Sequence, residues 1–241
     1  MNKNIFYTIL KSSNQDRWET YELLIRYFQK KDSCGIHKAT EHAESSISRF
    51  IEFVNQEITE SISLKKEPLF SPNTNSNTTT VNRNYFIVEQ IKEQIYSDIT
   101  DKEFEKLCAK VFSKHFKTND FNVCQSVGGG DGGYDFYLKT ILSKHPLFII
   151  KIYGQAKQWK NTIDRPEIDK FAGAPFKKKI NKIHFLVFVT TSTFTEGALQ
   201  YAKSEDIICL DGFQLSTMIF ENNKIDCING KINDVIKELA E

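Results

Sequence analysis

The chain lacks several features that would assign it to a particular class of protein. No segment approaches the roughly 20 apolar residues that a membrane-spanning helix needs. Residues 1–18 carry too short an apolar run for a signal peptide, so a cytoplasmic protein is expected. No internal repeat is visible. A G-x-x-x-x-G-K-[ST] motif is also missing, which argues against a nucleotide-binding P-loop.

Cysteine is scarce and scattered. The five cysteines form no C-x-x-C pair, which argues against a clustered zinc motif, and their odd number argues against a disulfide framework. Cys108 lies in a helical apolar pattern, while Cys124 and Cys209 lie in strand-like runs. We therefore expect these three residues to be small core side chains.

The chain also lacks a charge excess of either sign. Its net charge is +1, so any DNA-binding surface must arise from local clustering of Lys and Arg. The residues are 40% hydrophobic and 26% charged, which is typical of a folded globular protein.

The first part of the chain has helical periodicity. Apolar residues recur at helical spacing from Trp18 to Phe28 and again from Ala43 to Ile58. Residues 65–84 then contain two prolines and a run of Asn, Thr and Ser, which is typical of a linker. We predict a helical module over 1–64, a linker over 65–84 and a second domain over 85–241. The alternative is one domain with a long surface loop.

After this linker, the pattern alternates between helices and strands. Thr100 and Glu103 have the spacing of a capping box, which predicts a helix start. The predicted helices cover 86–99, 101–116, 165–173, 195–203 and two stretches at the end; the predicted strands cover 121–127, 134–142, 147–156, 183–190 and 206–210. This order predicts an α/β domain with a mixed central sheet flanked by helices. Residues 183–190, IHFLVFVT, should form a central strand buried on both faces.

Three polar residues are expected to meet at the open end of a hairpin. If the strands around the turn-like SKHP are symmetric about His145, then Asp135 falls opposite Gln155. A slip of one residue would change which faces meet, so this register is a hypothesis. Gln155 and Lys157 are two residues apart in one strand and therefore point to the same face.

This arrangement suits phosphodiester hydrolysis. The carboxylate of Asp135 and the amide oxygen of Gln155 are oxygen ligands of the kind that Mg²⁺ prefers. A bound cation polarises the phosphate and lowers the pKa of a bound water. Lys157 can orient that water or stabilise charge on the phosphorus. The glycines in GGGDGG, 128–133, allow close approach of a polyanion, while Asp131 is expected to form the turn.

An ordered series of motifs resembles the Mrr-like branch of the PD-(D/E)xK nucleases. The motifs, in chain order from about Phe104 to Met218, are FEKL, GGGDGGYDF, GQAK, FAGA, VTTSTFTEGALQYA and IICLDGFQL. A lone aspartate followed by Q-x-K would be a weak signal, whereas this ordered series is specific. The resemblance implies a restriction-endonuclease-like fold and a nuclease activity.

The resemblance also implies roles for individual residues. Asp135 and Gln155 would bind Mg²⁺, or Mn²⁺ in its place, and Lys157 would be catalytic. Glu105 matches a first-helix glutamate that contributes to the metal site in some relatives. Most members of the superfamily have Asp or Glu where this chain has Gln155, so the cation should bind more weakly and depend on the DNA phosphate.

Candidate DNA contacts follow the Q-x-K motif. Lys160 is a candidate phosphate contact, as are Lys177, Lys178 and Lys179 in the basic run KKKINK. A solvated loop is the alternative for that run. Trp159 is expected to cover the edge of the core rather than stack on a base. Thr190 to Thr195 are expected to end a strand and cap a helix.

The leading hypothesis is an endonuclease that cuts double-stranded DNA in restriction or another antiviral defence, of type II or of the modification-dependent type IV. A homodimer is expected, because a double-strand break by single-site nucleases usually needs two active sites. Two alternatives remain: a catalytically silent DNA-binding protein with a nuclease fold, and a nuclease that acts on RNA or structured DNA.

Overall fold

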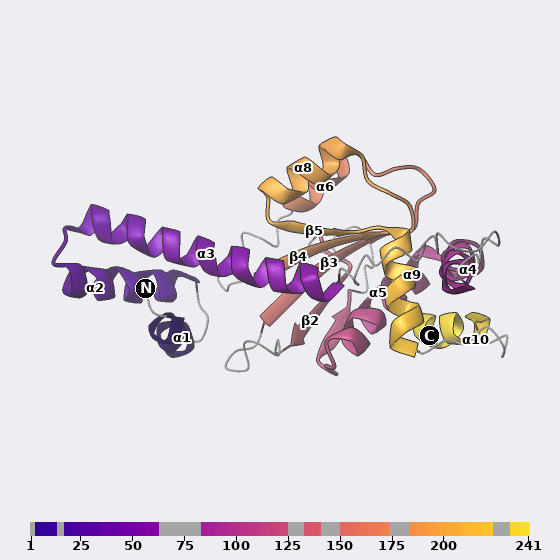
Figure 1. Ribbon diagram of the computed structural model, residues 1–241, viewed down its shortest axis with the longest axis horizontal. Helices are drawn as coiled ribbons and strands as arrows, with labels where there is room; N and C mark the ends of the chain where they lie inside the picture. The colour runs from indigo at the N-terminus through magenta and orange to yellow at the C-terminus, as the bar shows by residue number, and fades with distance from the viewer. Residues whose placement is uncertain are drawn as a thin grey trace, which may run out of the picture.

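The computed structural model describes residues 3–13, 17–62, 83–124, 133–140, 150–173, 184–223 and 232–241. The helices are α1 (Lys3–Ser12), α2 (Arg17–Asp32), α3 (Ile36–Ile62), α4 (Arg83–Asp98), α5 (Asp101–His115), α6 (Arg165–Ala172), α8 (Glu196–Ser204), α9 (Gly212–Asn223) and α10 (Ile232–Ala240). The strands are β1 (Phe121–Val123), β2 (Phe136–Thr140), β3 (Ile150–Lys157), β4 (His184–Thr190) and β5 (Ile207–Leu210). A sheet with helices around it confirms the predicted α/β class (Figure 1). Among the described helices, none combines the length and apolar character needed to cross a bilayer.

Helices α1–α3 extend to one side of the sheet, and the long α3 runs back towards the strands (Figure 1). The two predicted helical stretches are α2 and α3, whose apolar faces bury Leu24, Ala43 and Val54 completely. Helix α1, which was not predicted, packs through Phe6 against Phe50 of α3, with ring centroids 5.0 Å apart.

The predicted division into domains stays a prediction. Of the predicted linker 65–84, the structure describes only the last two residues, which open α4. The buried apolar residues of α1–α3 belong to the same contiguous cluster as those of α5 and the sheet. The N-terminal helices therefore share apolar packing with the second part of the chain.

The sheet has the order β1-β2-β3-β4-β5. Strands β1, β2 and β3 are antiparallel neighbours, whereas β3, β4 and β5 are parallel. The predicted burial of β4 on both faces is confirmed, since all its residues after His184 are buried. It is an interior strand, but β3 occupies the middle, because two antiparallel strands extend the sheet beyond β3.

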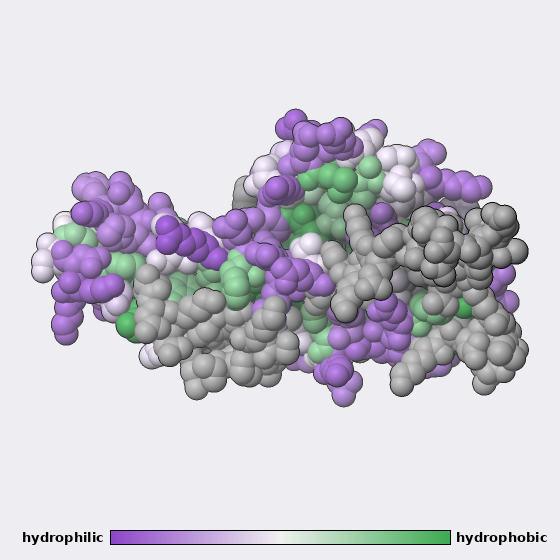
Figure 2. All heavy atoms as spheres, in the orientation of Figure 1, coloured by the Kyte–Doolittle hydropathy of each residue, from purple (hydrophilic) through white to green (hydrophobic). Residues whose placement is uncertain are grey.

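Helices cover both faces of the sheet (Figure 1). On one face, Phe112 of α5 packs against Phe136 of β2, with ring centroids 5.6 Å apart. On the other face, Phe171 of α6 contacts Phe188 of β4 at 5.8 Å. Figure 2 shows apolar side chains gathered where α6 and α8 meet the sheet. Strand β3 thus lies between two apolar layers.

The predicted capping box begins α5. The Thr100 N–H donates to Glu103 Oε2 at 2.7 Å, and the Glu103 N–H donates to Thr100 Oγ1 at 3.4 Å. These bonds satisfy two backbone N–H groups, which fixes where the helix starts and which way its side chains point.

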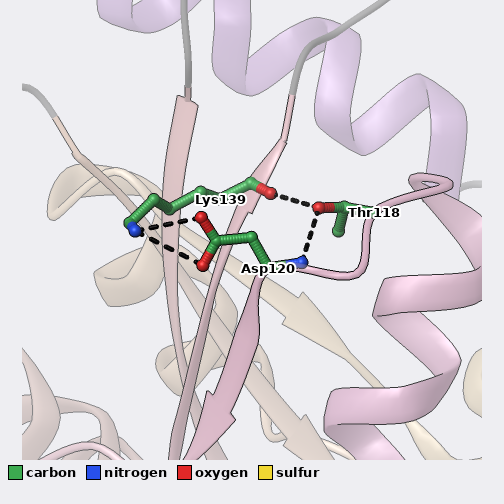
Figure 3. Close-up of polar contacts among 3 residues, drawn as sticks. All are labelled: Thr118, Asp120 and Lys139. Carbon is green, nitrogen blue, oxygen red and sulfur yellow. Dashed lines mark hydrogen bonds and ion pairs between the residues drawn. The ribbon is translucent and has the colours of Figure 1, made fainter.

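The turn after α5 is joined to β2 by polar contacts (Figure 3). Thr118 Oγ1 donates to the Lys139 carbonyl at 2.6 Å, and the Lys139 N–H donates to the Asp120 carbonyl at 2.8 Å. Lys139 Nζ also lies 3.0 Å from Asp120 Oδ2. This partly exposed ion pair contributes little by itself. Together with the backbone bonds, it holds α5, β1 and β2 in one arrangement.

Candidate active site

The register of β2 and β3 brings Asp135 beside Gln155. Phe136 pairs with Gly154 and Thr140 with Ile150, so both pairs are centred on position 145. The predicted register is therefore confirmed, although His145 itself lies outside the described residues. Asp135 immediately precedes β2, where the strands begin to separate.

Asp135 is buried, and its carboxylate replaces part of the sheet's hydrogen-bond ladder. Oδ2 accepts a bond from the Ala156 N–H at 2.7 Å and another from the side-chain amide of Gln155. The backbone is held as well: the Asp135 N–H donates to the Gly154 carbonyl, and the Cys124 N–H donates to the Asp135 carbonyl. The carboxylate is thus positioned by β3, and its backbone is held between β3 and the residue that follows β1.

Gly154 is required by the packing beneath the site. A Cβ at this position would overlap the ring of Phe136, which is fully buried on the neighbouring strand. The glycine lets the Phe136 ring lie across β3, directly below the backbone that binds Asp135.

Lys157 ends β3 beside β4. Its carbonyl accepts bonds from Thr190 Oγ1 at 2.9 Å and from the Thr191 N–H at 3.3 Å. The Lys157 side chain is partly buried and shares a face of β3 with Gln155. As predicted, Thr190 and Thr191 lie at the end of a strand, where they bind the Lys157 carbonyl. Thr195 caps α8, also as predicted, by accepting a hydrogen bond from the Ala198 N–H.

Glu105 reaches the same site from α5. Burial, followed by the negative charge of Asp135, raises the pKa of Glu105 to about 7, while Lys157 acts in the opposite direction. The two carboxyl groups and the ammonium group are therefore close enough to influence one another. A cation placed between the carboxylates would relieve their repulsion.

Cys108 lies beneath the carboxyl groups, one helical turn after Glu105. Burial, with the charges of Asp135 and Glu105, raises the pKa of its thiol well above the ordinary value. Burial likewise raises the pKa of Cys209 to about 12. Cys108 is fully buried, which confirms that it is a core residue, whereas Cys124 and Cys209 are only partly buried. Burial keeps a thiol neutral and unreactive.

Oxygen donors dominate the site. In the part of the chain that the structure describes, no three His, Cys, Asp or Glu residues gather into a metal cluster. The candidate donors are the carboxylates of Asp135 and Glu105 and the amide of Gln155. This set fits Mg²⁺, which takes few protein oxygens and keeps several waters.

The predicted DNA contacts are only partly described. Lys160 is exposed, and its Nζ lies 5.0 Å from the ring centroid of Tyr96 at the end of α4. Lys177, Lys178 and Lys179 lie outside the described residues, as do Asp131 and glycines 128–130. Trp159 is 40% exposed, so its indole is partly buried, and its place at the edge of the core stays a prediction.

Sequence reasoning missed Gln158. Its side-chain amide binds carbonyl groups at the end of α4, more than fifty residues earlier in the chain. Its place directly after Q-A-K was the only available signal, and no local pattern indicates its partners.

A comparison with protein-family models identifies the family of this chain. The model of the Mrr catalytic domain, described as restriction endonuclease, matches residues 96–219, which is just over half of the chain. The chain belongs to this Mrr-like restriction endonuclease family. The matched range contains Glu105, Asp135, Gln155 and Lys157, whereas α1–α3 precede it.

One curated relative of this Mrr-like chain is the type IV methyl-directed restriction enzyme EcoKMrr of Escherichia coli K12. The two are 33% identical over 138 residues, which cover 56% of this chain and 43% of the relative. The chain thus matches less than half of that enzyme's length.

Two solved restriction endonucleases are also similar. MspJI, in complex with a 27-mer oligonucleotide, gives a TM-score of 0.46 at 17% identity, over 63% of this chain and 34% of its own. AspBHI, a DNA modification-dependent enzyme, gives 0.48 at 14% identity, over 64% and 38%. More than half of each neighbour lies outside the overlap.

Proposed function

We propose that the chain is a Mg²⁺-dependent endonuclease that hydrolyses phosphodiester bonds in double-stranded DNA. The observation that carries this proposal is the meeting of Asp135, Gln155, Lys157 and Glu105 at one end of the β2–β3 pair. Membership of the Mrr-like family supports the reaction class.

Each of the four residues has its own role in this proposal. Asp135 and Gln155 hold the cation, and Glu105 adds a second carboxylate from α5. The cation, when bound, polarises the phosphate and acidifies a water. Lys157 directs its ammonium group at the attacking water or at the charge that develops on the phosphate oxygens.

Because Gln155 is neutral, the affinity for the cation should depend on whether DNA is bound. Asp135 contributes one negative charge, and Glu105 is only partly ionised near neutral pH, because its pKa is about 7. With Lys157 nearby, the free site attracts a dication weakly. The scissile phosphate supplies further negative charge and oxygen ligands, so DNA and Mg²⁺, or Mn²⁺, should bind cooperatively.

DNA affinity in this proposal comes from basic side chains beside the site. Lys160 follows β3 by three residues, and the basic run KKKINK offers Lys177, Lys178 and Lys179 as further candidate contacts. Such contacts bind phosphates without reading sequence. Target choice then falls to the helical module 1–64, which would read sequence or base modification, sense a signal or mediate dimerisation.

A role in restriction or antiviral defence fits the family. The matched relative is a methyl-directed type IV enzyme, which favours a modification-dependent target over an unmodified type II site. A homodimer would supply the two active sites that a double-strand break needs.

Plasmid cleavage tests the proposal. Methylated and unmethylated plasmids are incubated with the protein in Mg²⁺ or in EDTA, alongside Asp135→Ala and Lys157→Ala. Asp120→Ala is the matched control, because it removes a carboxylate that directly precedes β1 and pairs with Lys139, away from the site. We expect Mg²⁺-dependent cleavage by the wild type and the control, and none by the two site variants.

Other outcomes would replace the proposal. Cleavage that persists in both site variants would refute the assigned residues. Tight binding of DNA without cleavage would favour a silent DNA-binding protein with this fold. Cleavage confined to RNA or branched DNA would assign a different substrate.

A further inference from the structure

The side chain of Gln158 closes the end of α4. Its Nε2 group donates to the carbonyls of Ile95 at 2.8 Å and Ile99 at 2.7 Å, with the Tyr96 carbonyl further away at 3.4 Å. The last carbonyls of a helix have no partner within it. A primary amide carries two N–H groups, so one side chain serves the two nearer carbonyls.

This contact joins two elements of the active site. Gln158 directly follows Lys157, whereas Ile99 precedes Thr100, the N-cap of α5. Glu105 lies in the second turn of that helix. The amide therefore fixes the start of α5 against the end of β3, and with it the approach of Glu105 to Lys157.

The segment that carries Gln158 is itself held on two sides. Thr191 Oγ1 donates to the Trp159 carbonyl at 2.8 Å, and Ser192 Oγ donates to the Lys160 carbonyl at 2.9 Å. On the side of α4, the Lys160 ammonium lies over the Tyr96 ring. Gln158 thus projects from a backbone that the loop after β4 holds in place.

We propose that Gln158 is a positioning residue of the active site, which holds the α4–α5 corner so that Glu105 and Lys157 face the same cation and phosphate. This inference rests on the proposed function. It assigns a role to a side chain that does not touch the reacting groups and acts through the helix that presents Glu105.

Three variants test this role. Gln158→Met keeps the length of the side chain but removes both donors. Gln158→Lys restores donors and places a cation at a helix C-terminus, where it is favourable. Thr140→Val is the matched control, since Thr140 Oγ1 donates to the Phe116 carbonyl and so fastens the opposite end of α5 to β2.

Two measurements follow each variant: the Mg²⁺ concentration that half-saturates cleavage, and the affinity of the DNA-free protein for Mn²⁺ by calorimetry. We expect Gln158→Met to raise the half-saturating Mg²⁺ concentration and lower the Mn²⁺ affinity, each on the order of 10-fold, because loss of a hydrogen bond that supports metal ligands typically has an effect of this size. Gln158→Lys should recover most of the loss. Thr140→Val should lower the melting temperature and leave both values unchanged. Equal changes in Gln158→Met and Thr140→Val would overturn the inference.

Hydrogen exchange separates this inference from the proposed function. The Phe104 N–H donates to the Thr100 carbonyl in the first turn of α5. Its exchange should accelerate in Gln158→Met more than in Thr140→Val, whether or not the protein cuts DNA. If the wild type cleaves nothing but the two variants still differ in exchange, only the nuclease proposal is refuted. Unchanged exchange in Gln158→Met would refute the positioning role.

Discussion

The carboxylate of Asp135 and the side-chain amide of Gln155 are hydrogen-bonded across the start of the β2–β3 pair. The same carboxylate oxygen accepts the Ala156 N–H. Asp135 therefore has a structural task as well as the proposed catalytic one, and suitable substitutions separate the two.

Asp135→Asn should abolish cleavage but keep most of the stability, because its amide oxygen still accepts the Ala156 N–H. Asp135→Leu leaves that buried donor unpaired, which typically costs about 1–3 kcal/mol. Urea denaturation of both variants, beside a cleavage assay, measures the difference. Equal loss of stability in both would show that the Ala156 bond contributes nothing.

Gln155→Glu should make the metal-free protein less stable and its cation affinity higher. The new carboxylate would face Asp135 in place of a donor, and a bound dication would then gain a charged ligand. We expect a lower melting temperature in EDTA and a roughly 10-fold tighter Mg²⁺ affinity, worth about 1.4 kcal/mol.

Gln200→Glu is the matched control for this change. Gln200 also donates to a carboxylate, that of Glu196, but on the exposed surface of α8. A like-charge pair there should cost only about 0.2–0.5 kcal/mol and leave the Mg²⁺ dependence unchanged. Equal behaviour of the two variants would contradict a cation site at Gln155.

Glu105→Gln should stabilise the metal-free protein at alkaline pH. The pKa of Glu105 is raised from 4.5 to about 7, so between these values the folded state binds more protons than the unfolded state. Stability contributed by the neutral carboxyl is complete below pH 4.5 and is lost as pH rises through 7. Glutamine cannot ionise and avoids this loss.

The measurement is the melting temperature in EDTA from acidic to alkaline pH. We expect Glu105→Gln to exceed the wild type by about 2–5 °C near pH 8 and to match it near pH 4. Added Mg²⁺ should raise the melting temperature of the wild type above that of Glu105→Gln, since only the wild type has the second carboxylate to bind the cation. A difference that does not vary with pH would contradict the raised pKa.

Gly154→Ala should destabilise the fold because its Cβ would overlap the Phe136 ring. The added methyl group meets the buried Phe136 ring, and overpacking of this kind typically costs about 1–3 kcal/mol. Phe136→Leu makes room, so the double variant should lose less stability than the sum of the single variants. Additive losses in chemical denaturation would show that the ring is not the obstacle.

Lys160→Ala should weaken DNA binding without changing target choice. Loss of one phosphate contact should lower the slope of log K against log salt by about 1. Lys139→Ala is the control, because its ammonium group is paired with Asp120 at the β1–β2 edge. Fluorescence anisotropy at several salt concentrations, in Ca²⁺ to prevent cleavage, makes the comparison. An unchanged slope would remove Lys160 from the DNA contacts.

The features predicted correctly depend on local rules. The capping box of Thr100 and Glu103 follows from a three-residue spacing. The pairing of Asp135 with Gln155 follows from two apolar strands whose positions in the sequence are symmetric about residue 145. In both cases the residues that decide the structure are close in sequence.

The features that were missed depend on distant contacts. Gln158 binds carbonyls about sixty residues away, and no periodicity links it to them. The shifted pKa of Glu105 arises from a helix packing against a hairpin. Each depends on how elements pack, which residue spacing does not encode.

The change from antiparallel to parallel pairing at β3 also bears on when the site forms during synthesis. Only nine residues of sequence separate β2 from β3, the strands that bring Asp135 to Gln155, whereas the Lys157 carbonyl binds Thr190, which follows 33 residues later. Non-local parallel pairing forms more slowly than a hairpin. A nascent chain would thus carry every proposed catalytic side chain well before Lys157 is anchored, so the proposed site would be complete only after β4 has docked.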